Sequence, residues 1–238
     1  MALADLHHAL PPGAAFHVEV PAAGAAGAGP SSRGGGGVEG WSEPDLADVL
    51  VGAGLDIDTL DADGELVRAS GRRARSLPDT VGPGMRLLVC GLNPSLYAAD
   101  RGVAFARPGN RFWPAAIETG LVSRPLDARH ALACHGIGFT DLCKRATAAS
   151  AELSAAEYRD GAARVERLAG WMQPGAVLFV GLEGWRAAFD RRATPGRQPR
   201  PFGGRPVYVM PSTSGLNART SRAELVGHLR AAARLART

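Results

Sequence analysis

The sequence predicts an α/β fold, a three-layer sandwich with a central, mostly parallel sheet flanked by helices. Short apolar runs of strand length alternate with longer amphipathic stretches, and this alternation is typical of parallel sheets. The predicted strands are 86–92, 176–181 and 206–210, with a weaker candidate at 136–140. The predicted helices are 111–119, 154–172, 182–191 and 221–235, with Ser154 and Ser221 as N-caps of two of them.

The first 80 residues lack this alternation. Residues 1–40 are rich in glycine and alanine, which bury too little apolar surface to offset the entropy lost on ordering, so we expect a disordered extension. Residues 41–80 form an acidic segment whose structure the sequence leaves open, with one candidate amphipathic helix at 44–50. The regular pattern starts near Met85, and we therefore place the main domain at 81–238.

Charge divides the chain in the same way. Residues 1–80 carry 12 acidic and 5 basic side chains, a net charge of −7, whereas residues 81–238 carry 11 acidic and 22 basic side chains, a net charge of +11. A basic domain attracts nucleic acid because neutralised phosphates release their condensed counterions. The alternative interpretation is an ordinary solvated basic surface.

Cysteine spacing and hydropathy exclude several classes of protein. Cys90, Cys134 and Cys143 are isolated, which argues against a disulfide framework or a four-thiolate cluster. The Asp-rich run 56–63 lacks the glycine and the terminal glutamate of a calcium loop. The N-terminus has no signal-peptide pattern, and no apolar run approaches the ~18 residues of a membrane span. We expect a cytoplasmic protein without a membrane segment.

Two unusual loops follow the first and the last predicted strand. The first is Gly91-Leu92-Asn93-Pro94-Ser95-Leu96-Tyr97, and the second runs from Pro211 to Arg219. Ligands bind at the carboxyl ends of strands in open parallel sheets, although Asn-Pro-Ser and Ser-Gly are also ordinary turn sequences. Neither of the glycine-rich phosphate-binding motifs follows the first strand.

Three motifs in order carry a resemblance to a known family. They are Gly91-Leu92-Asn93-Pro94-Ser95, then Gly102-Val103-Ala104-Phe105-Ala106-Arg107-Pro108-Gly109-Asn110-Arg111-Phe112-Trp113, and finally Pro211-Ser212-Thr213-Ser214-Gly215-Leu216. From about Leu77 to the C-terminus the chain resembles the mismatch-specific uracil-DNA glycosylases, the thymine-DNA glycosylase branch of the uracil-DNA glycosylase superfamily.

The resemblance implies a monofunctional enzyme of base excision repair. Such an enzyme hydrolyses the N-glycosidic bond of a flipped-out uracil, from a G:U mismatch and from other damaged pyrimidines. Its partner is DNA, duplex or single-stranded, and it works as a monomer associated with the nucleoid, with no cofactor and no metal. The alternative is a catalytically weak lesion-binding or nucleotide-binding protein on the same fold.

Two residues carry the catalytic roles that the resemblance implies. Asn93 corresponds to the asparagine that holds the attacking water, where faster members carry an aspartate. Because an amide is a poor general base, turnover should be slow unless a carboxylate assists. Asp141 follows the weaker candidate strand, and in some members a carboxylate at this position assists catalysis. The alternative for Asp141 is an N-cap or a salt bridge to Lys144 or Arg145.

The remaining positions are assigned to the base and to the DNA. Phe105 corresponds to the aromatic ring that stacks on the extruded base, and we assign Gly91, Leu92, Pro94, Ser95 and Tyr97 to the same pocket. Phe112 and Trp113 are expected in the core, and Asn110 is expected to fix its loop.

The second loop corresponds to the wedge that fills the gap left by the flipped base. Leu216 is the intercalating residue by resemblance, because an apolar side chain at the tip of a polar loop suits insertion into a duplex. Gly215 and Asn217 would approach the widowed guanine. Ser212, Ser214 and Arg219 would hold the flanking phosphates.

Overall fold

The computed structural model describes residues 3–23 and 40–237. The chain divides into two compact units, Met1–Arg75 and Ser76–Thr238. The second unit starts five residues before the domain boundary expected from the sequence.

The first unit contains a three-stranded antiparallel sheet with the order β1-β3-β2. Its elements are α1 (Leu3–Ala9), β1 (Ala15–Pro21), α2 (Glu43–Gly52), β2 (Leu55–Ala62) and β3 (Leu66–Arg73). Helix α2 presents Leu46 and Leu50 to a small core that also contains Leu55 and Val67. This sheet gives the acidic part of the chain a hydrophobic core of its own.

The prediction that residues 1–40 are disordered is wrong for residues 3–23. Strand β1 pairs with β3 along its whole length, from Ala15 opposite Arg72 to Pro21 opposite Leu66, and it buries Phe16. The partner strand lies about fifty residues further along the chain, so local composition does not reveal it. The most glycine-rich part, 24–39, lies outside the described residues.

The segment 41–80 also folds. The predicted helix at 44–50 is confirmed as α2, with Ser42 as N-cap accepting a hydrogen bond from the Asp45 amide at 3.3 Å. The Asp-rich run forms strand β2, in which Asp56, Asp58 and Asp61 are exposed. These carboxylates remain in water, which explains how a strand of such polar composition is tolerated.

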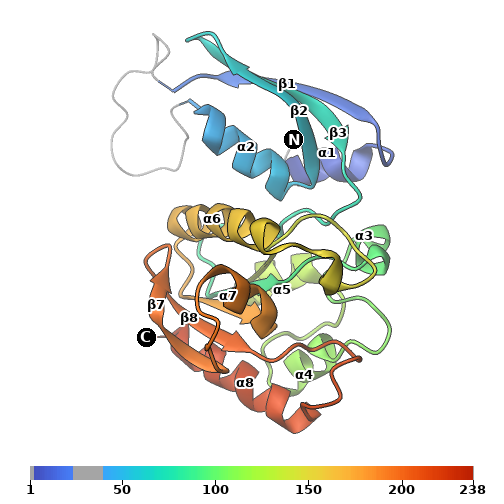
Figure 1. The fold of residues 1–238 in the computed structure, drawn as a ribbon, viewed down its shortest axis with the longest axis vertical. Helices are drawn as coiled ribbons and strands as arrows, with labels where there is room; N and C mark the ends of the chain where they lie inside the picture. The colour runs from blue at the N-terminus through green and yellow to red at the C-terminus, as the bar shows by residue number, and fades with distance from the viewer. Residues whose placement is uncertain (1–2, 24–39, 238) are drawn as a thin grey trace. The chain divides into compact units, whose positions relative to one another are not determined.

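The second unit confirms the predicted α/β class. Its five-stranded sheet has the order β5-β4-β6-β8-β7 and is drawn from green to orange-red in Figure 1. The strands are β4 (Leu87–Gly91), β5 (Ile137–Asp141), β6 (Ala176–Val180), β7 (Gly196–Phe202) and β8 (Arg205–Met210). All neighbouring pairs are parallel except β7 with β8.

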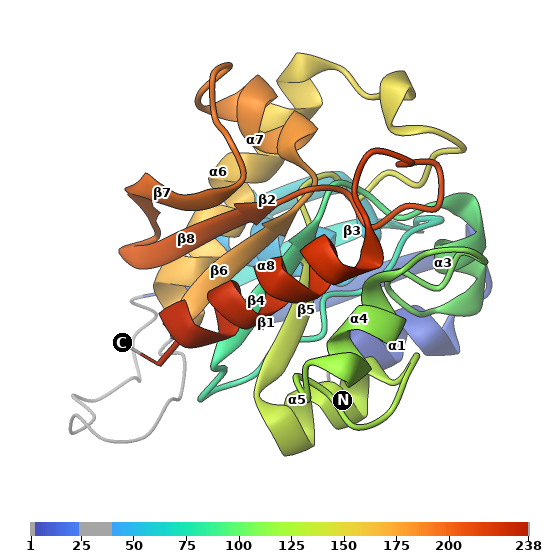
Figure 2. The same ribbon diagram turned by 90° about the horizontal axis from the view of Figure 1, so that it is seen from below.

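Helices cover both faces of this sheet and complete the three layers. The face seen in Figure 2 is covered by α4 (Phe112–Glu118), α5 (Ala128–His135) and α8 (Arg222–Leu235), which pack on Leu87, Val89 and Leu178. The other face is covered by α6 (Ala155–Met172) and α7 (Leu182–Ala188), which pack on Leu88, Cys90 and Phe179. Successive strand residues serve opposite cores, which is why these strands are continuously apolar.

Elements whose local sequence patterns are weak were not predicted. Strand β7 contains two prolines and three polar side chains, and it is tolerated because it lies at the edge of the sheet. Helix α3 (Leu96–Arg101), helix α5 and the 3₁₀ turn Ser150–Glu152 were not predicted either. Ser154 and Ser221 cap α6 and α8, as predicted, and both caps belong to capping boxes.

Two glycines on α6 provide a matched test of the packing. A Cβ at Gly161 would collide with the Leu142 carbonyl, whereas a Cβ at Gly170 would meet no atom within 4 Å. We expect Gly161→Ala to lower the free energy of unfolding by roughly 1–3 kcal/mol. Gly170→Ala should raise it by roughly 0.5–1 kcal/mol through helix propensity. Urea unfolding of both variants checks this, and equal effects would contradict the close approach of α6 to the loop after β5.

Candidate active site

A pocket of about 200 Å³ opens at the carboxyl ends of the parallel strands. Four segments line it, lying within 91–98, 105–110, 147–150 and 212–216, and Leu77, Asp141 and Val180 complete the wall. The structure therefore brings together the first loop (91–97), the motif 102–113 that contains Phe105 (the phenylalanine motif), the loop after β5 and the loop 211–219 (the last loop). These segments are separated by as many as 125 residues in sequence, from Gly91 to Leu216.

The pairing of β4 with β5 positions the floor of the pocket. Gly91 lies opposite Asp141 in the parallel ladder, and a Cβ at Gly91 would collide with Asp141 Oδ1 and contact Phe105 Cζ at 3.5 Å. The ladder continues beyond the strands, because the Leu142 and Cys143 amides donate to the carbonyls of Gly91 and Leu92 at 3.0 and 2.9 Å. The first loop and the loop after β5 therefore leave the sheet side by side.

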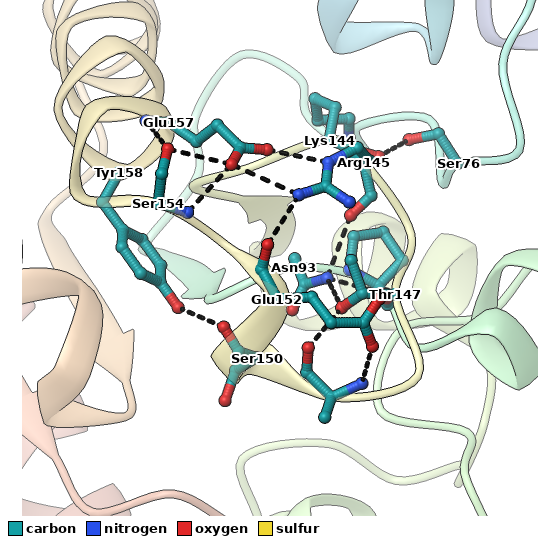
Figure 3. A network of polar contacts seen from close by, with 12 residues as sticks. Ser76, Asn93, Lys144, Arg145, Thr147, Ser150, Glu152, Ser154, Glu157 and Tyr158 are labelled. Atoms are coloured by element: carbon teal, nitrogen blue, oxygen red, sulfur yellow. Dashed lines mark hydrogen bonds and ion pairs between the residues drawn. The ribbon is translucent and has the colours of Figure 1, made fainter.

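The orientation of Asn93 follows from its hydrogen bonds (Figure 3). Its Nδ2 donates to the carbonyls of Arg145 at 2.9 Å and Pro94 at 3.1 Å and to Thr147 Oγ1 at 2.7 Å. Carbonyl oxygens only accept, so the amide nitrogen must face the loop after β5. The carboxamide oxygen accepts no hydrogen bond from any residue that the structure describes. Asn93 Oδ1 is therefore free to accept a hydrogen bond from a water.

The loop that holds Asn93 is itself tied to helix α6 (Figure 3). Arg145 Nε donates to Glu157 Oε1 at 2.8 Å, and Arg145 Nη2 donates to the Glu152 carbonyl at 2.9 Å. Glu157 also accepts from the Ser154 amide at 2.9 Å within the capping box of α6. The start of α6 thus fixes the backbone carbonyl that orients Asn93.

Asp141 is a buried carboxylate with one side toward the pocket. The residue is 7% exposed, and burial raises its pKa to about 6, with the positive charges of Lys144 and Arg164 opposing the rise and Asp79 adding to it. Neither alternative interaction is present. Lys144 pairs with Asp79, Arg145 pairs with Glu157, and Ser154 caps the helix that follows.

Phe105 is held in an unusual backbone conformation. Its φ is 57°, in the left-handed region that costs a bulky residue about 1 kcal/mol or more. The ring stacks on Phe112 with centroids 4.4 Å apart and an interplanar angle of 20°, and it lines the pocket. Phe112 and Trp113 are in the core as predicted, and Asn110 Oδ1 accepts from the Phe112 amide at 2.9 Å.

Of the residues expected in the base pocket, Tyr97 lies outside the lining and Ser95 also caps a helix. Tyr97 lies on α3, is 46% exposed and is not among the residues that line the pocket. Ser95 lines the pocket, but its hydroxyl caps α3 by accepting from the Ala98 amide at 3.1 Å. Leu92 and Pro94 contribute to the pocket wall.

Leu216 lies at the rim of the pocket and is 79% exposed, the largest exposed fraction among the large apolar side chains that the structure describes. Its loop is folded on itself. Ser212 and Ser214 accept from the amides of Ser214 and Leu216, and Asn217 Nδ2 donates to the Ser212 carbonyl at 2.8 Å. A Cβ at Gly215 would meet the Gly109 carbonyl at 2.8 Å. Arg219 is exposed and outside the pocket lining.

Arg111 joins this loop to the phenylalanine motif, a role that the sequence did not reveal. Its guanidinium donates to the carbonyls of Thr220 at 2.5 Å, Asn217 at 2.6 Å and Ser214 at 3.2 Å. Its amide donates to the Thr213 carbonyl at 2.9 Å. All four acceptors are backbone oxygens, so no side-chain pattern announces the contact. Thr147, which binds Asn93, was missed for the same lack of a local signal.

Comparison with known proteins identifies the family. Residues 78–234 match the family model of the uracil DNA glycosylase superfamily. The chain belongs to this superfamily. A solution structure of a candidate uracil DNA glycosylase from Methanosarcina acetivorans is similar to the chain, with 20% sequence identity and a TM-score of 0.48, over 68% of this chain and 97% of that one.

Membership makes the protein a DNA glycosylase in general terms, a hydrolase whose substrate is DNA. The family match begins at residue 78 and so covers the second unit only. Among the described residues, no group of three or more His, Cys, Asp or Glu side chains could hold a metal ion. No helix within residues 3–23 and 40–237 is long and apolar enough to cross a membrane.

Removal of the Arg111 guanidinium should loosen the last loop. Arg111→Met deletes three hydrogen bonds to loop carbonyls, so we expect the amides of residues 212–219 to exchange with deuterium at least about tenfold faster. Arg222→Met is the matched control, because Arg222 forms an exposed ion pair with Glu118. Equal exchange in the two variants would contradict the role of Arg111 as the support of this loop.

Proposed function

We propose that the chain is a monofunctional uracil-DNA glycosylase of the mismatch-specific branch, acting on uracil in DNA, including uracil opposite guanine, in base excision repair. The observation that carries this proposal is that Asn93, the buried carboxylate residue Asp141 and the aromatic residue Phe105 all line one pocket. Such a pocket offers a flipped pyrimidine an aromatic face, a group that accepts from water and a negative charge.

In the proposed hydrolysis, Asn93 and Asp141 have separate roles. Cleavage of the bond between the base and C1′ develops positive charge on the sugar and negative charge on the departing base. In our proposal Asn93 Oδ1 orients the attacking water, and ionised Asp141 accepts its proton or stabilises the cationic sugar. A pKa of about 6 leaves most of the carboxylate ionised at neutral pH while keeping it basic enough to accept a proton.

Phe105 supplies the surface on which the base stacks. One face of its ring is already covered by Phe112, so the pocket-lining side remains for a nucleobase. The strained backbone at Phe105 supports a functional role, because such strain persists where the surrounding structure over-determines a conformation. The absence of a Cβ at Gly91 leaves room for the Asp141 carboxylate close to the tip of this ring.

Leu216 is proposed as the wedge that enters the duplex. Flipping costs a few kcal/mol of stacking and pairing, which an inserted apolar side chain offsets in part by filling the gap. Its exposure at the rim of the pocket supports this role. The amides and side chains of Ser212, Ser214 and Asn217 are largely engaged within the loop, so we assign phosphate contacts first to the exposed Arg219.

A uracil-excision assay tests the proposal. Purified protein without added metal or cofactor should convert a duplex with a G:U pair into an abasic product. Asn93→Ala and Asp141→Asn should each lower the single-turnover rate by about 10²-fold or more. Asp160→Asn, the same chemical change on the exposed surface of α6, is the control and should retain the full rate.

The outcomes of this assay separate the alternatives. Tight binding of uracil-containing DNA without any abasic product would favour a catalytically weak lesion-binding protein and contradict the proposed glycosylase activity. An unchanged rate for Asp141→Asn would leave Asn93 as the catalytic group and remove Asp141 from the mechanism.

The wedge is tested by comparing substrates. Leu216→Ala should lower excision from duplex DNA by about tenfold and leave excision from single-stranded DNA nearly unchanged, because only a duplex leaves a gap to fill. Leu126→Ala is the control, since Leu126 is 45% exposed and lies outside the pocket. Equal losses on both substrates would argue against intercalation by Leu216.

A further inference from the structure

A buried ionic network lies behind the end of strand β5. Asp79 is its centre: its carboxylate accepts from Lys144 Nζ and Arg164 Nη1, both at 2.8 Å, and from Thr140 Oγ1 at 2.7 Å. All three charged side chains are buried: Asp79 is 8% exposed, Lys144 9% and Arg164 6%. All three belong to the second unit, yet they come from three different segments of the chain.

The choice of lysine at position 144 is unusual for this chain. Of 27 basic residues, Lys144 is the single lysine and the other 26 are arginines. A compact ammonium binds one carboxylate oxygen as a point charge, whereas a guanidinium needs room for its planar fork. Burying an ion pair costs several kcal/mol per ion in desolvation and is weak support for stability. The network therefore calls for an explanation beyond folding.

Arg164 of this network and the nearby Ser76 donate hydrogen bonds to the chain around Asp141. Arg164 Nη2 donates to the Asp141 carbonyl at 2.9 Å and to Thr140 Oγ1 at 3.1 Å. Ser76 Oγ donates to the Lys144 carbonyl at 2.5 Å, three residues beyond Asp141. The Asp141 carboxylate itself accepts no hydrogen bond within the described part of the chain. Its position is therefore set through its backbone and through the contact with Gly91.

We propose that Asp79, Lys144 and Arg164 are positioning residues that hold Asp141 in the pocket and set the pH range over which its carboxylate is ionised. This inference rests on the proposed catalytic role of Asp141. It assigns a purpose to two cations and one anion that are not among the residues lining the pocket.

The sign of each contribution follows from its charge. Burial raises the pKa of Asp141, Lys144 and Arg164 lower it, and Asp79 raises it. The other titratable groups near Asp141 are the thiols of Cys90 on β4 and Cys143 on the following loop, and burial raises the pKa of both, that of Cys143 to about 12. These thiols stay neutral in the range in which Asp141 titrates. Arg107 also lines the pocket, but the charges that act on the pKa of Asp141 are those of Lys144, Asp79 and Arg164.

Opposite substitutions should therefore move the acid limb in opposite directions. Uracil excision that needs ionised Asp141 should fall as the pH drops through the pKa of Asp141. Asp79→Asn removes a negative neighbour and should shift this limb to lower pH, whereas Lys144→Met removes a positive neighbour and should shift it to higher pH, each by about half a unit or more. A role in stability alone would lower both rates without shifts of opposite sign.

The control pair is Glu166→Gln and Arg200→Met. These residues form an ion pair at 3.0 Å whose side chains are 33% and 45% exposed, so their loss should leave the limb where it is. Single-turnover rates from pH 5 to 9 provide the profiles, and a ¹³C-carboxyl NMR titration assigned with Asp141→Asn reports the ionisation of Asp141 independently of activity.

Asp79→Glu tests positioning separately from charge. It keeps the negative charge and lengthens the side chain, so we expect an unshifted limb with a maximal rate lowered about tenfold or more. An unchanged maximal rate would overturn the positioning role, and this variant remains decisive if a neutral variant fails to fold.

The outcomes also distinguish this inference from the function on which it rests. Identical pH profiles for the wild type and Asp141→Asn would reject Asp141 as a catalytic group. A limb that depends on Asp141 but does not move in opposite directions in Asp79→Asn and Lys144→Met would reject the network alone.

Discussion

The geometry of the candidate active site depends on the parallel pairing of β4 with β5. This pairing sets Gly91 opposite Asp141 and carries hydrogen bonds past the strand ends, so that the loops of Asn93 and Asp141 leave the sheet together. Every residue of both strands is buried, and a slip of one residue would turn each side chain to the opposite core. The two hydrophobic cores thus fix the register, and the register brings the two polar groups to one pocket.

The sequence predicted the parts of the fold whose signals are local. The strands buried on both faces and the capping boxes at Ser154 and Ser221 are readable within a few residues. Strands β1 and β7 cannot be recognised in this way, because each forms by pairing with another strand. Strand β1 pairs with β3, and β7 pairs with β8. The disorder that composition alone predicts is therefore wrong for residues 3–23.

The residues of the candidate site also fall into those that the sequence predicted and those that it did not. Motifs and resemblance predicted Asn93, Asp141, Phe105 and Leu216, and the structure places all four at one pocket. The groups that hold them were missed, since Asn93 is oriented through a threonine 54 positions away and the last loop through Arg111, more than 100 positions away. Supporting contacts made to backbone carbonyls leave no pattern of side-chain types in the sequence.

The short segment 105–113 connects the two halves of the proposed reaction. It carries the ring on which the base would stack at Phe105 and the guanidinium that supports the last loop at Arg111, and directly after Arg111 it is anchored in the core by Phe112. A flipped base already costs a few kcal/mol, so an enzyme that also had to order its pocket and its wedge on binding would lose affinity by that further amount. The strain at Phe105, of about 1–3 kcal/mol, is met on folding by the packing of Phe112 instead. In our proposal this one segment holds both the stacking ring and the support of the wedge, so their separation would set how far a nucleotide must leave the duplex before its base reaches Asn93 and Asp141.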